Sequence, residues 1–262
     1  MNQKSRIPIL AYHKIRPALP DEPRASLVVE PEALVAHLAA LRRWGYRLTT
    51  LRDLGGTAEI QKTEGESRTR ATGEPAVLTF DDGFACLYEH ALPILRRGAA
   101  PAVIFLVSGR IGGYNDFPGN RDRSRERLLD AGQIRELAEA GIEMGSHTVS
   151  HRGLTALGDT ELRTELADSR AAIEDLTGRP VLSLAYPYGY LDDRVVAAAR
   201  EAGYRYACTT LRGTRQALDD PLRLRRVAMG ARVGVWRLRY RLSRLYEWER
   251  EWKEHGASRR RS

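Results

Sequence analysis

Short apolar runs alternate with amphipathic stretches along most of the chain. Residues 7–13 have the composition of a buried strand, and Pro31 opens a run in which leucines recur at helical spacing up to Trp44. From residue 76 the alternation is regular. It predicts strands at 76–80, 102–107, 142–144, 182–186 and 204–209, with helices at 87–97, 131–140, 160–177 and 192–202. Strands and helices that alternate in this way form a parallel sheet or barrel, which predicts an α/β fold.

Two segments depart from this alternation. Residues 55–75 are polar and rich in Gly, Thr and Glu, which is typical of a mobile loop. Residues 235–252 have Leu238, Leu242 and Leu245 at helical spacing, with arginines and aromatic residues around them. This amphipathic helix either docks on the main domain or lies on an anionic membrane surface, and docking is the commoner use of such spacing.

The length of 262 residues and the hydrophobic content of 42% suit one large domain. We expect a catalytic domain at 7–228 and, at 229–262, a C-terminal extension of amphipathic helix and basic tail. The net charge of +8 includes three arginines at 259–261, and the other basic residues are mixed with acids, so no nucleic-acid partner is expected. The N-terminus lacks the apolar run of a signal peptide, which predicts a cytoplasmic protein.

Two adjacent carboxylates follow the predicted strand 76–80. Asp81 and Asp82 come directly after Phe80, where the loops of parallel strands build active sites. One carboxylate at such a position can bind a metal while its neighbour moves protons. An Asp-Asp-Gly turn without chemical function is the alternative reading.

Two histidines follow the predicted strand 142–144. His147 and His151 are four residues apart, and in a helical turn this spacing brings both imidazoles onto one face, within reach of one divalent ion. Two unrelated loop histidines are the alternative. A third strand end carries a Pro/Gly turn at 184–189, which either directs the backbone N–H of Tyr188 into the site as an oxyanion donor or simply packs its tyrosines.

Together these three motifs resemble those of the polysaccharide deacetylases, carbohydrate esterase family 4. The resemblance covers roughly residues 7–228 and rests on segments 79–83, 146–151 and 186–189. It implies a distorted (β/α) barrel of the seven-stranded type and a hydrolase that removes N-acetyl groups from amino sugars. It also implies a divalent ion, zinc or else nickel, cobalt or manganese. The implied ligands are Asp82, His147 and His151, and the implied general base is Asp81.

The chain departs from the family pattern at two places. Much of the family has an arginine before the Pro-Tyr turn that orients the base, whereas Ala185 and Tyr186 precede Pro187 here. Many members also carry a late histidine that protonates the leaving amine, and residues 222–227 contain none. His13, which ends a strand similar to one in a branch of the family, and a reprotonated Asp81 are equal candidates for this general acid.

The expected substrate is an N-acetylated glycan or glycolipid, acted on as a polysaccharide or as its lipid-linked or nucleotide-linked precursor. Because the motifs specify only the reacting atoms, hydrolysis of another non-peptide amide is an alternative. The two departures also leave open a carbohydrate-binding protein that has lost turnover.

Overall fold

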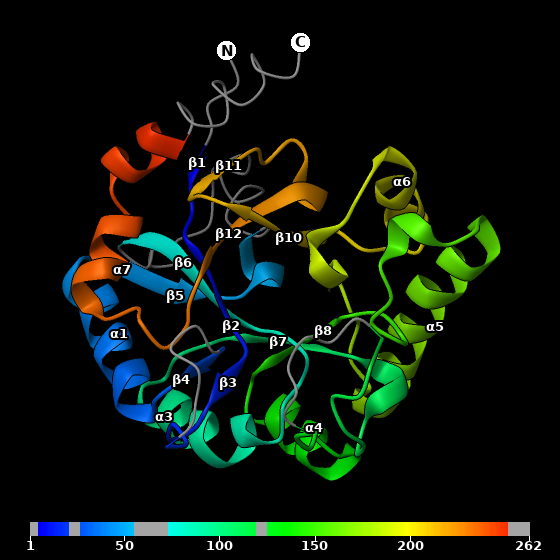
Figure 1. Ribbon diagram of the computed structural model, residues 1–262, viewed down its shortest axis with the longest axis horizontal. Coiled ribbons are helices and arrows are strands. Elements are labelled where there is room, and N and C mark those ends of the chain that lie inside the picture. Colours follow the sequence, from blue (N-terminus) through cyan, green and yellow to red (C-terminus); the bar gives the residue numbers. More distant parts are fainter. Residues whose placement is uncertain (1–4, 21–26, 55–72, 119–124, 251–262) are drawn as a thin grey trace, which may run out of the picture.

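A closed barrel of seven parallel strands lies at the centre of the molecule (Figure 1). The computed structural model describes residues 5–20, 27–54, 73–118 and 125–250. The ring closes because the strand at residues 9–12 pairs with the strand at 224–228 on one side and with the strand at 74–80 on the other. In order around the barrel, the strands are β2 (Ile9–Tyr12), β12 (Leu224–Ala228), β10 (Tyr206–Arg212), β9 (Ser183–Ala185), β8 (Glu143–Ser146), β7 (Val103–Leu106) and β6 (Glu74–Phe80). The predicted distorted (β/α) barrel is confirmed.

Helices surround the barrel and cover its outer face (Figure 1). They are α1 (Pro31–Arg43), α3 (Leu92–Arg97), α4 (Ala131–Glu139), α5 (Asp159–Thr177), α6 (Asp193–Glu201) and α7 (Val235–Arg241). Capping residues fix where two of these helices begin. Asp130 and Gln133 form a capping box on α4, and Asp192 accepts a hydrogen bond from the Val195 N–H on α6. The predicted helix 87–97 differs, because it opens with a π-helical turn, Leu87–Ala91, ahead of Pro93. A proline has no N–H for the regular helical ladder, which suits it to this junction.

Several short strands escaped prediction because they are too short or too polar to show a period. β5 (Tyr46–Thr49) extends the sheet beside β6, and β1 (Ser5–Arg6) pairs antiparallel with β11 (Arg215–Gln216). β3 (Lys14–Ile15) pairs with β4 (Val28–Val29). Short 3₁₀ turns occur at Ser108–Arg110, Leu154–Ala156, Pro187–Gly189 and Pro221–Arg223. Residues 55–72 of the predicted polar loop lie outside the described residues. The loop ends earlier than predicted, because β6 already begins at Glu74.

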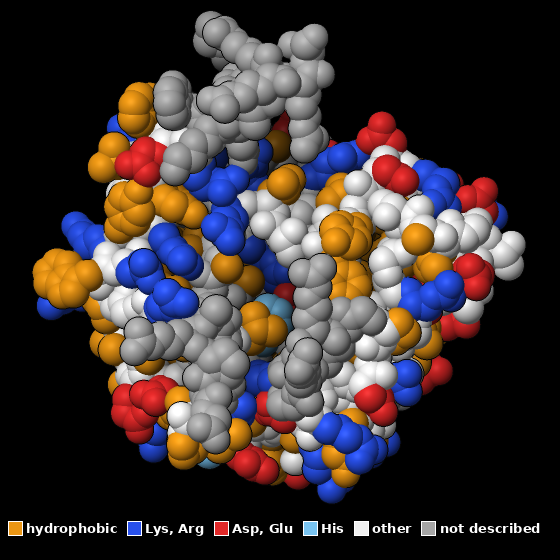
Figure 2. Space-filling view, viewed as in Figure 1, with side chains coloured by type: hydrophobic (Ala, Val, Ile, Leu, Met, Phe, Trp, Pro, Cys, Tyr) orange, Lys and Arg blue, Asp and Glu red, His pale blue; other side chains and the backbone are white. Residues whose placement is uncertain are grey.

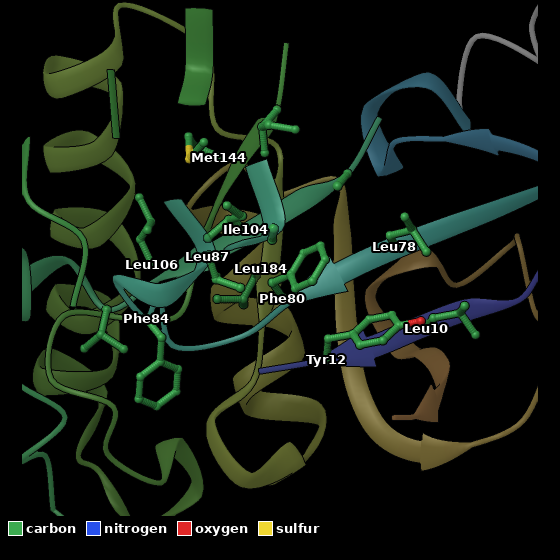
Figure 3. Close-up of a cluster of buried hydrophobic side chains, with 14 of the residues drawn as sticks. Leu10, Tyr12, Leu78, Phe80, Phe84, Leu87, Ile104, Leu106, Met144 and Leu184 are labelled. Carbon is green, nitrogen blue, oxygen red and sulfur yellow. The ribbon is translucent and has the colours of Figure 1, made fainter. Parts of the chain in front are cut away.

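Alternate residues of the barrel strands belong to two separate cores. Ile9, Val77 and Val103 belong to a small cluster of ten buried residues, seven of which are on the barrel strands. Their neighbours Leu10, Leu78 and Ile104 face outward into a larger cluster shared with the helices (Figure 3). Side chains on a strand alternate between its faces, so this register fixes which residues further along each strand point into the barrel.

The C-terminal extension docks on the barrel wall beside α1. Leu238 and Leu242 are buried, and the Val233 carbonyl accepts a hydrogen bond from His37 Nε2 on α1 at 2.7 Å. The predicted single helix 235–252 is wrong in extent. α7 ends at Arg241, and residues 244–250 are helical again after a break. Trp252 and the basic tail lie outside the described residues, and within the described ranges no helix has the length and apolar character needed to cross a membrane.

Candidate metal centre and active site

The strand register brings polar side chains from three strands to one end of the barrel. His13 lies four positions beyond the inward-facing Ile9, Asp81 four beyond Val77, and Arg226 two beyond Leu224. Because even spacing along a strand keeps side chains on one face, each of these residues continues an inward-facing row. The candidate site therefore lies at the carboxyl end of the barrel.

These side chains line a cavity of about 640 Å³ that opens at this end. Figure 2 shows pale blue histidine atoms in a hollow near the centre of the face viewed. The wall combines charged groups with aromatic and aliphatic ones, which suits a ligand that is partly apolar and partly polar. The lining residues used below are His13, Asp81, Asp82, His147, His151, Tyr188 and Arg226.

Asp82, His147 and His151 form a compact group of metal-ligating type. Asp82 Oδ1 lies 3.5 Å from His147 Nε2 and 3.4 Å from His151 Nε2, and the ligand atoms of all three residues lie within 4.8 Å of one another. Ligands at about 2.1 Å from a tetrahedral ion are about 3.4 Å apart, so the spacing fits one zinc-sized ion. Three protein ligands facing a cavity also leave a position open, as in catalytic metal sites.

Hydrogen bonds turn the Nε2 atom of both histidines toward Asp82. His147 Nδ1 lies 2.7 Å from the Ala185 carbonyl and so carries a proton that it donates there. Tyr188 Oη donates to the Pro118 carbonyl at 2.5 Å and therefore accepts from His151 Nδ1 at 3.2 Å. With Nδ1 protonated, each neutral ring presents its Nε2 lone pair to the centre, as a metal ligand must.

Burial supports the neutral form of both rings. It lowers the pKa of His147, and it lowers the pKa of His151 to about 2, with a further contribution from the neighbouring His147. A histidine must be deprotonated on the atom that binds a metal, so the environment prepares the group for an ion.

The backbone around this group is strained where the ligands sit. Asp82, Thr148, His151 and Tyr188 all have positive φ, between 59° and 69°. Such conformations cost of order 1–3 kcal/mol each in residues other than glycine and are concentrated at functional sites. The expected helical turn between the histidines is wrong: residues 147–151 form an irregular loop, and the left-handed backbone at Thr148 and His151 replaces helical geometry.

Glu165, on α5, holds this histidine loop. Its buried carboxylate accepts hydrogen bonds from the backbone N–H groups of Val149 and Ser150, both at 2.9 Å, and from the Ser150 hydroxyl. The two N–H groups belong to the segment that joins the histidines, so the carboxylate replaces the ladder of bonds that a helix would have made. Glu165 stands in no motif, and its position on the buried face of a predicted helix is its only sign in the sequence.

Asp81 is paired with Arg226 of β12. The guanidinium donates to both carboxylate oxygens, at 2.7 and 2.8 Å, and also to the Thr209 carbonyl at 2.9 Å. Burial alone would raise the pKa of Asp81, but the charge of Arg226 outweighs it and holds that pKa well below its usual range. Arg226 thus makes with Asp81 the contact that the resemblance leads one to expect of an arginine before Pro187, and it comes instead from the stretch 222–227.

His13, directly after β2, also lies close to Asp81. Its Nε2 is 3.9 Å from Asp81 Oδ2, and 23% of its side chain is exposed to the cavity. Among the described residues its buried Nδ1 has no hydrogen-bond partner. Burial lowers the pKa of His13 to about 4, against the opposing effect of Asp81. The ring is therefore placed to exchange a proton with a ligand in the cavity.

Comparison with known proteins agrees with this arrangement. The family model described as polysaccharide deacetylase matches residues 68–207, more than half of the chain. YxkH of Bacillus subtilis, a protein named for the same family, is 27% identical over 206 residues, which cover 79% of this chain and 65% of that protein. The peptidoglycan-N-acetylglucosamine deacetylase of Bacillus cereus is 29% identical over 129 residues, 49% of this chain and 53% of that protein. The chain thus spans between about half and two thirds of these relatives.

The fold has a close structural counterpart. The deacetylase PplD of Streptococcus pyogenes, solved in complex with acetate, superposes with a TM-score of 0.76 at 24% sequence identity. The match covers 92% of this chain and 100% of that one.

Proposed function

Because the chain belongs to the polysaccharide deacetylase family, we propose that it is a metal-dependent hydrolase that removes N-acetyl groups from amino sugars. The substrate is a polysaccharide or its lipid-linked or nucleotide-linked precursor. The observation that carries the proposal is the position of Asp81, held by Arg226, beside the Asp82–His147–His151 group in one cavity.

Asp82, His147 and His151 would hold the divalent ion. Zinc suits one carboxylate and two imidazoles, and nickel, cobalt and manganese are the other candidates. A bound divalent ion lowers the pKa of water from 15.7 to about 7 and polarises a carbonyl oxygen.

The residues around the ion divide the proton transfers. Asp81, ionised and oriented by Arg226, accepts the proton of the water that attacks the acetyl carbon. The backbone N–H of Tyr188 donates a hydrogen bond to the carbonyl oxygen as negative charge develops there, an interaction worth about 3 kcal/mol in comparable sites. His13 or the protonated Asp81 then donates a proton to the leaving nitrogen. The C–N bond breaks, and acetate and a free amine are the products.

An acetate-release assay tests this function. Purified protein is offered N-acetylhexosamine oligomers, nucleotide sugars and lipid-linked sugars, before and after metal removal and add-back. We expect acetate from at least one class, loss of activity with a chelator and recovery with zinc. The Asp81→Asn variant should keep its metal and lose turnover, and Asp175→Asn, at an exposed position on α5, is the matched control. Full activity in metal-loaded Asp81→Asn would refute the catalytic assignment.

The same assay separates the alternatives. Release of a different acid from a non-sugar amide would favour another hydrolase of C–N bonds, since the site constrains little beyond the reacting atoms. A carbohydrate-binding protein without turnover would release no acid from any substrate, and the pairing of Asp81 with Arg226 supports turnover over this alternative.

The cytoplasmic location and the membrane contact through residues 235–252 stay predictions. Cell fractionation tests the first. A lipid-linked substrate is presented at a bilayer, and membrane contact would bring the protein to such a substrate.

A further inference from the structure

Large apolar side chains are exposed in one short stretch near the C-terminus. Trp236 is 86% exposed, Trp248 62%, Leu245 55% and Tyr240 40%. They make up four of the ten exposed large hydrophobic residues in the described chain, within thirteen positions. Single exposed apolar residues need no explanation, but a concentration of this kind marks an interaction surface.

Packing among the residues that the structure describes does not account for them. α7 already uses its other face, because Leu238 and Leu242 are buried against the barrel wall. Trp236 and Tyr240 are four residues apart and lie together on the outer face of the helix. The two helical pieces are tied to each other, since the rings of Tyr240 and Tyr246 are 5.4 Å apart.

Arginines surround the exposed aromatic residues. Residues 229–250 contain six arginines and two glutamates, and Arg237, Arg239 and Arg244 are exposed. Glu247 turns inward and accepts a hydrogen bond from the Thr214 hydroxyl at 2.8 Å, so it does not offset this charge at the surface. Glu249 accepts a hydrogen bond from the Tyr240 hydroxyl at 2.5 Å and offsets one arginine, which leaves the surface net positive. Figure 2 shows Lys and Arg side chains gathered between the central hollow and α7, with hydrophobic side chains along the same edge. Aromatic and arginine side chains together are the composition of a surface that lies in a membrane interface.

This surface adjoins the opening of the cavity. Ala228 and Met229 line the cavity and come only a few residues before α7. Arg241 donates a hydrogen bond from α7 back to the Ala228 carbonyl. A partner bound to α7 would therefore lie beside the entrance through which substrate reaches Asp81.

We infer that the face formed by Trp236, Arg237, Tyr240, Arg244, Leu245 and Trp248, the α7 face, docks on an anionic phospholipid bilayer. Positive charge draws the α7 face to acidic headgroups, and the indole rings insert at the headgroup level. Docking brings the cavity entrance to the membrane surface, where a lipid-linked amino sugar would be presented. This partner lies beyond the proposed hydrolysis and does not depend on it.

Vesicle co-sedimentation of the full chain tests the inference. The vesicles contain phosphatidylcholine alone or with about a third phosphatidylglycerol, at low salt and at higher salt. We expect binding to the anionic vesicles only, weakened by salt because added ions screen the attraction. Arg237→Gln with Arg244→Gln should weaken the partition coefficient about 30-fold, which corresponds to ~1 kcal/mol for each arginine near an anionic surface.

Matched variants test the aromatic part. Trp236→Ser with Trp248→Ser should lower binding at least tenfold, whereas Val35→Ser and Arg163→Gln, at exposed positions on α1 and α5, should leave it unchanged. The tryptophan variant should keep the wild-type melting temperature, which shows that it is folded. Failure of wild-type protein to bind anionic vesicles overturns the inference, and so does a dimer that Trp236→Ser with Trp248→Ser dissociates while vesicle binding is absent. Neither result bears on deacetylation, because vesicle binding is measured without substrate.

Discussion

Arg226 and Asp81 form a two-point ion pair buried inside the barrel, with N–O distances of 2.7 and 2.8 Å. Each side chain is only 4% exposed. A carboxylate held on both oxygens cannot rotate, so its free lone pairs keep one direction toward the cavity. The pair therefore fixes both the charge and the orientation of the proposed base, Asp81.

Replacing Arg226 should damage stability and catalysis together. In Arg226→Leu a buried carboxylate loses its partner, which costs about 3–5 kcal/mol of unfolding free energy. The pKa of Asp81 should rise, and kcat should fall by about 100-fold or more as the base becomes protonated and mobile. Chemical denaturation and initial rates measure the two effects.

Two further variants separate the causes of the Arg226 effect. Arg225→Leu, on the same strand, should keep wild-type kcat. Arg226→Leu combined with Asp81→Leu should recover much of the stability and none of the activity, because no unpaired charge remains. Wild-type kcat in Arg226→Leu would show that the pair is structural only.

Glu165→Gln should weaken metal binding more than it weakens the fold. The amide keeps one acceptor oxygen but loses the charge that holds the Val149 and Ser150 N–H groups, so the histidine loop loosens. Loss of such supporting bonds typically costs 10–100-fold in metal affinity. Competition with a chromogenic chelator measures the zinc Kd, and thermal melting of the metal-free protein reports the fold.

Glu161→Gln is the control on the same helix. Glu161 is exposed and its ion pair with Arg152 lies at the surface, so its replacement should leave the zinc Kd unchanged. An equal loss of affinity in both variants would assign the effect to the charge of α5 and not to the loop.

His13→Asn should impair substrates according to their leaving group. An amide nitrogen leaves only when protonated, so kcat on an N-acetyl sugar should fall about 100-fold. An aryl acetate releases a stable phenolate and should be cleaved at nearly the wild-type rate. Parallel rates on both substrates measure the difference, with His90→Asn, outside the cavity, as control. Unchanged amide turnover would assign the proton to Asp81 instead.

His37 should make the fold sensitive to mild acid. It is fully buried, donates from Nε2 to the Val233 carbonyl and accepts from Tyr12 Oη at 3.2 Å, so both nitrogens are used by the neutral ring. Burial lowers the pKa of His37 below its ordinary value of 6.5. Below pH 6.5 the unfolded chain takes up a proton that the folded protein does not, and stability falls as the pH drops toward the folded pKa.

Comparison of pH profiles isolates this residue. Wild type should lose unfolding free energy more steeply than His37→Gln between pH 6.5 and 5, by up to about 1.4 kcal/mol per pH unit. Other buried histidines contribute to both profiles and cancel in the difference. Identical slopes would contradict the assignment.

Much of the fold follows from local pattern. The alternation of apolar runs and amphipathic stretches predicted six of the seven barrel strands and five of the helices around them, since burial on one face leaves its period in the sequence. The barrel strand that escaped prediction is β12, which has only five residues, two of them arginines. Its place in the barrel comes from pairing with β2 and β10, which are distant or separated by turns and leave no local signal.

The candidate site divides in the same way. Asp81, Asp82, His147 and His151 stand in short motifs directly after apolar strands, so the sequence by itself determined which residue types meet at the carboxyl end of the barrel. Only the tertiary structure decided what surrounds them. Residues 222–227 contain three arginines, and the register of β12 selects Arg226 to face inward, 145 positions along the chain from its partner Asp81. The physical reason is that a side chain's direction depends on strand register, which is fixed only when the barrel closes.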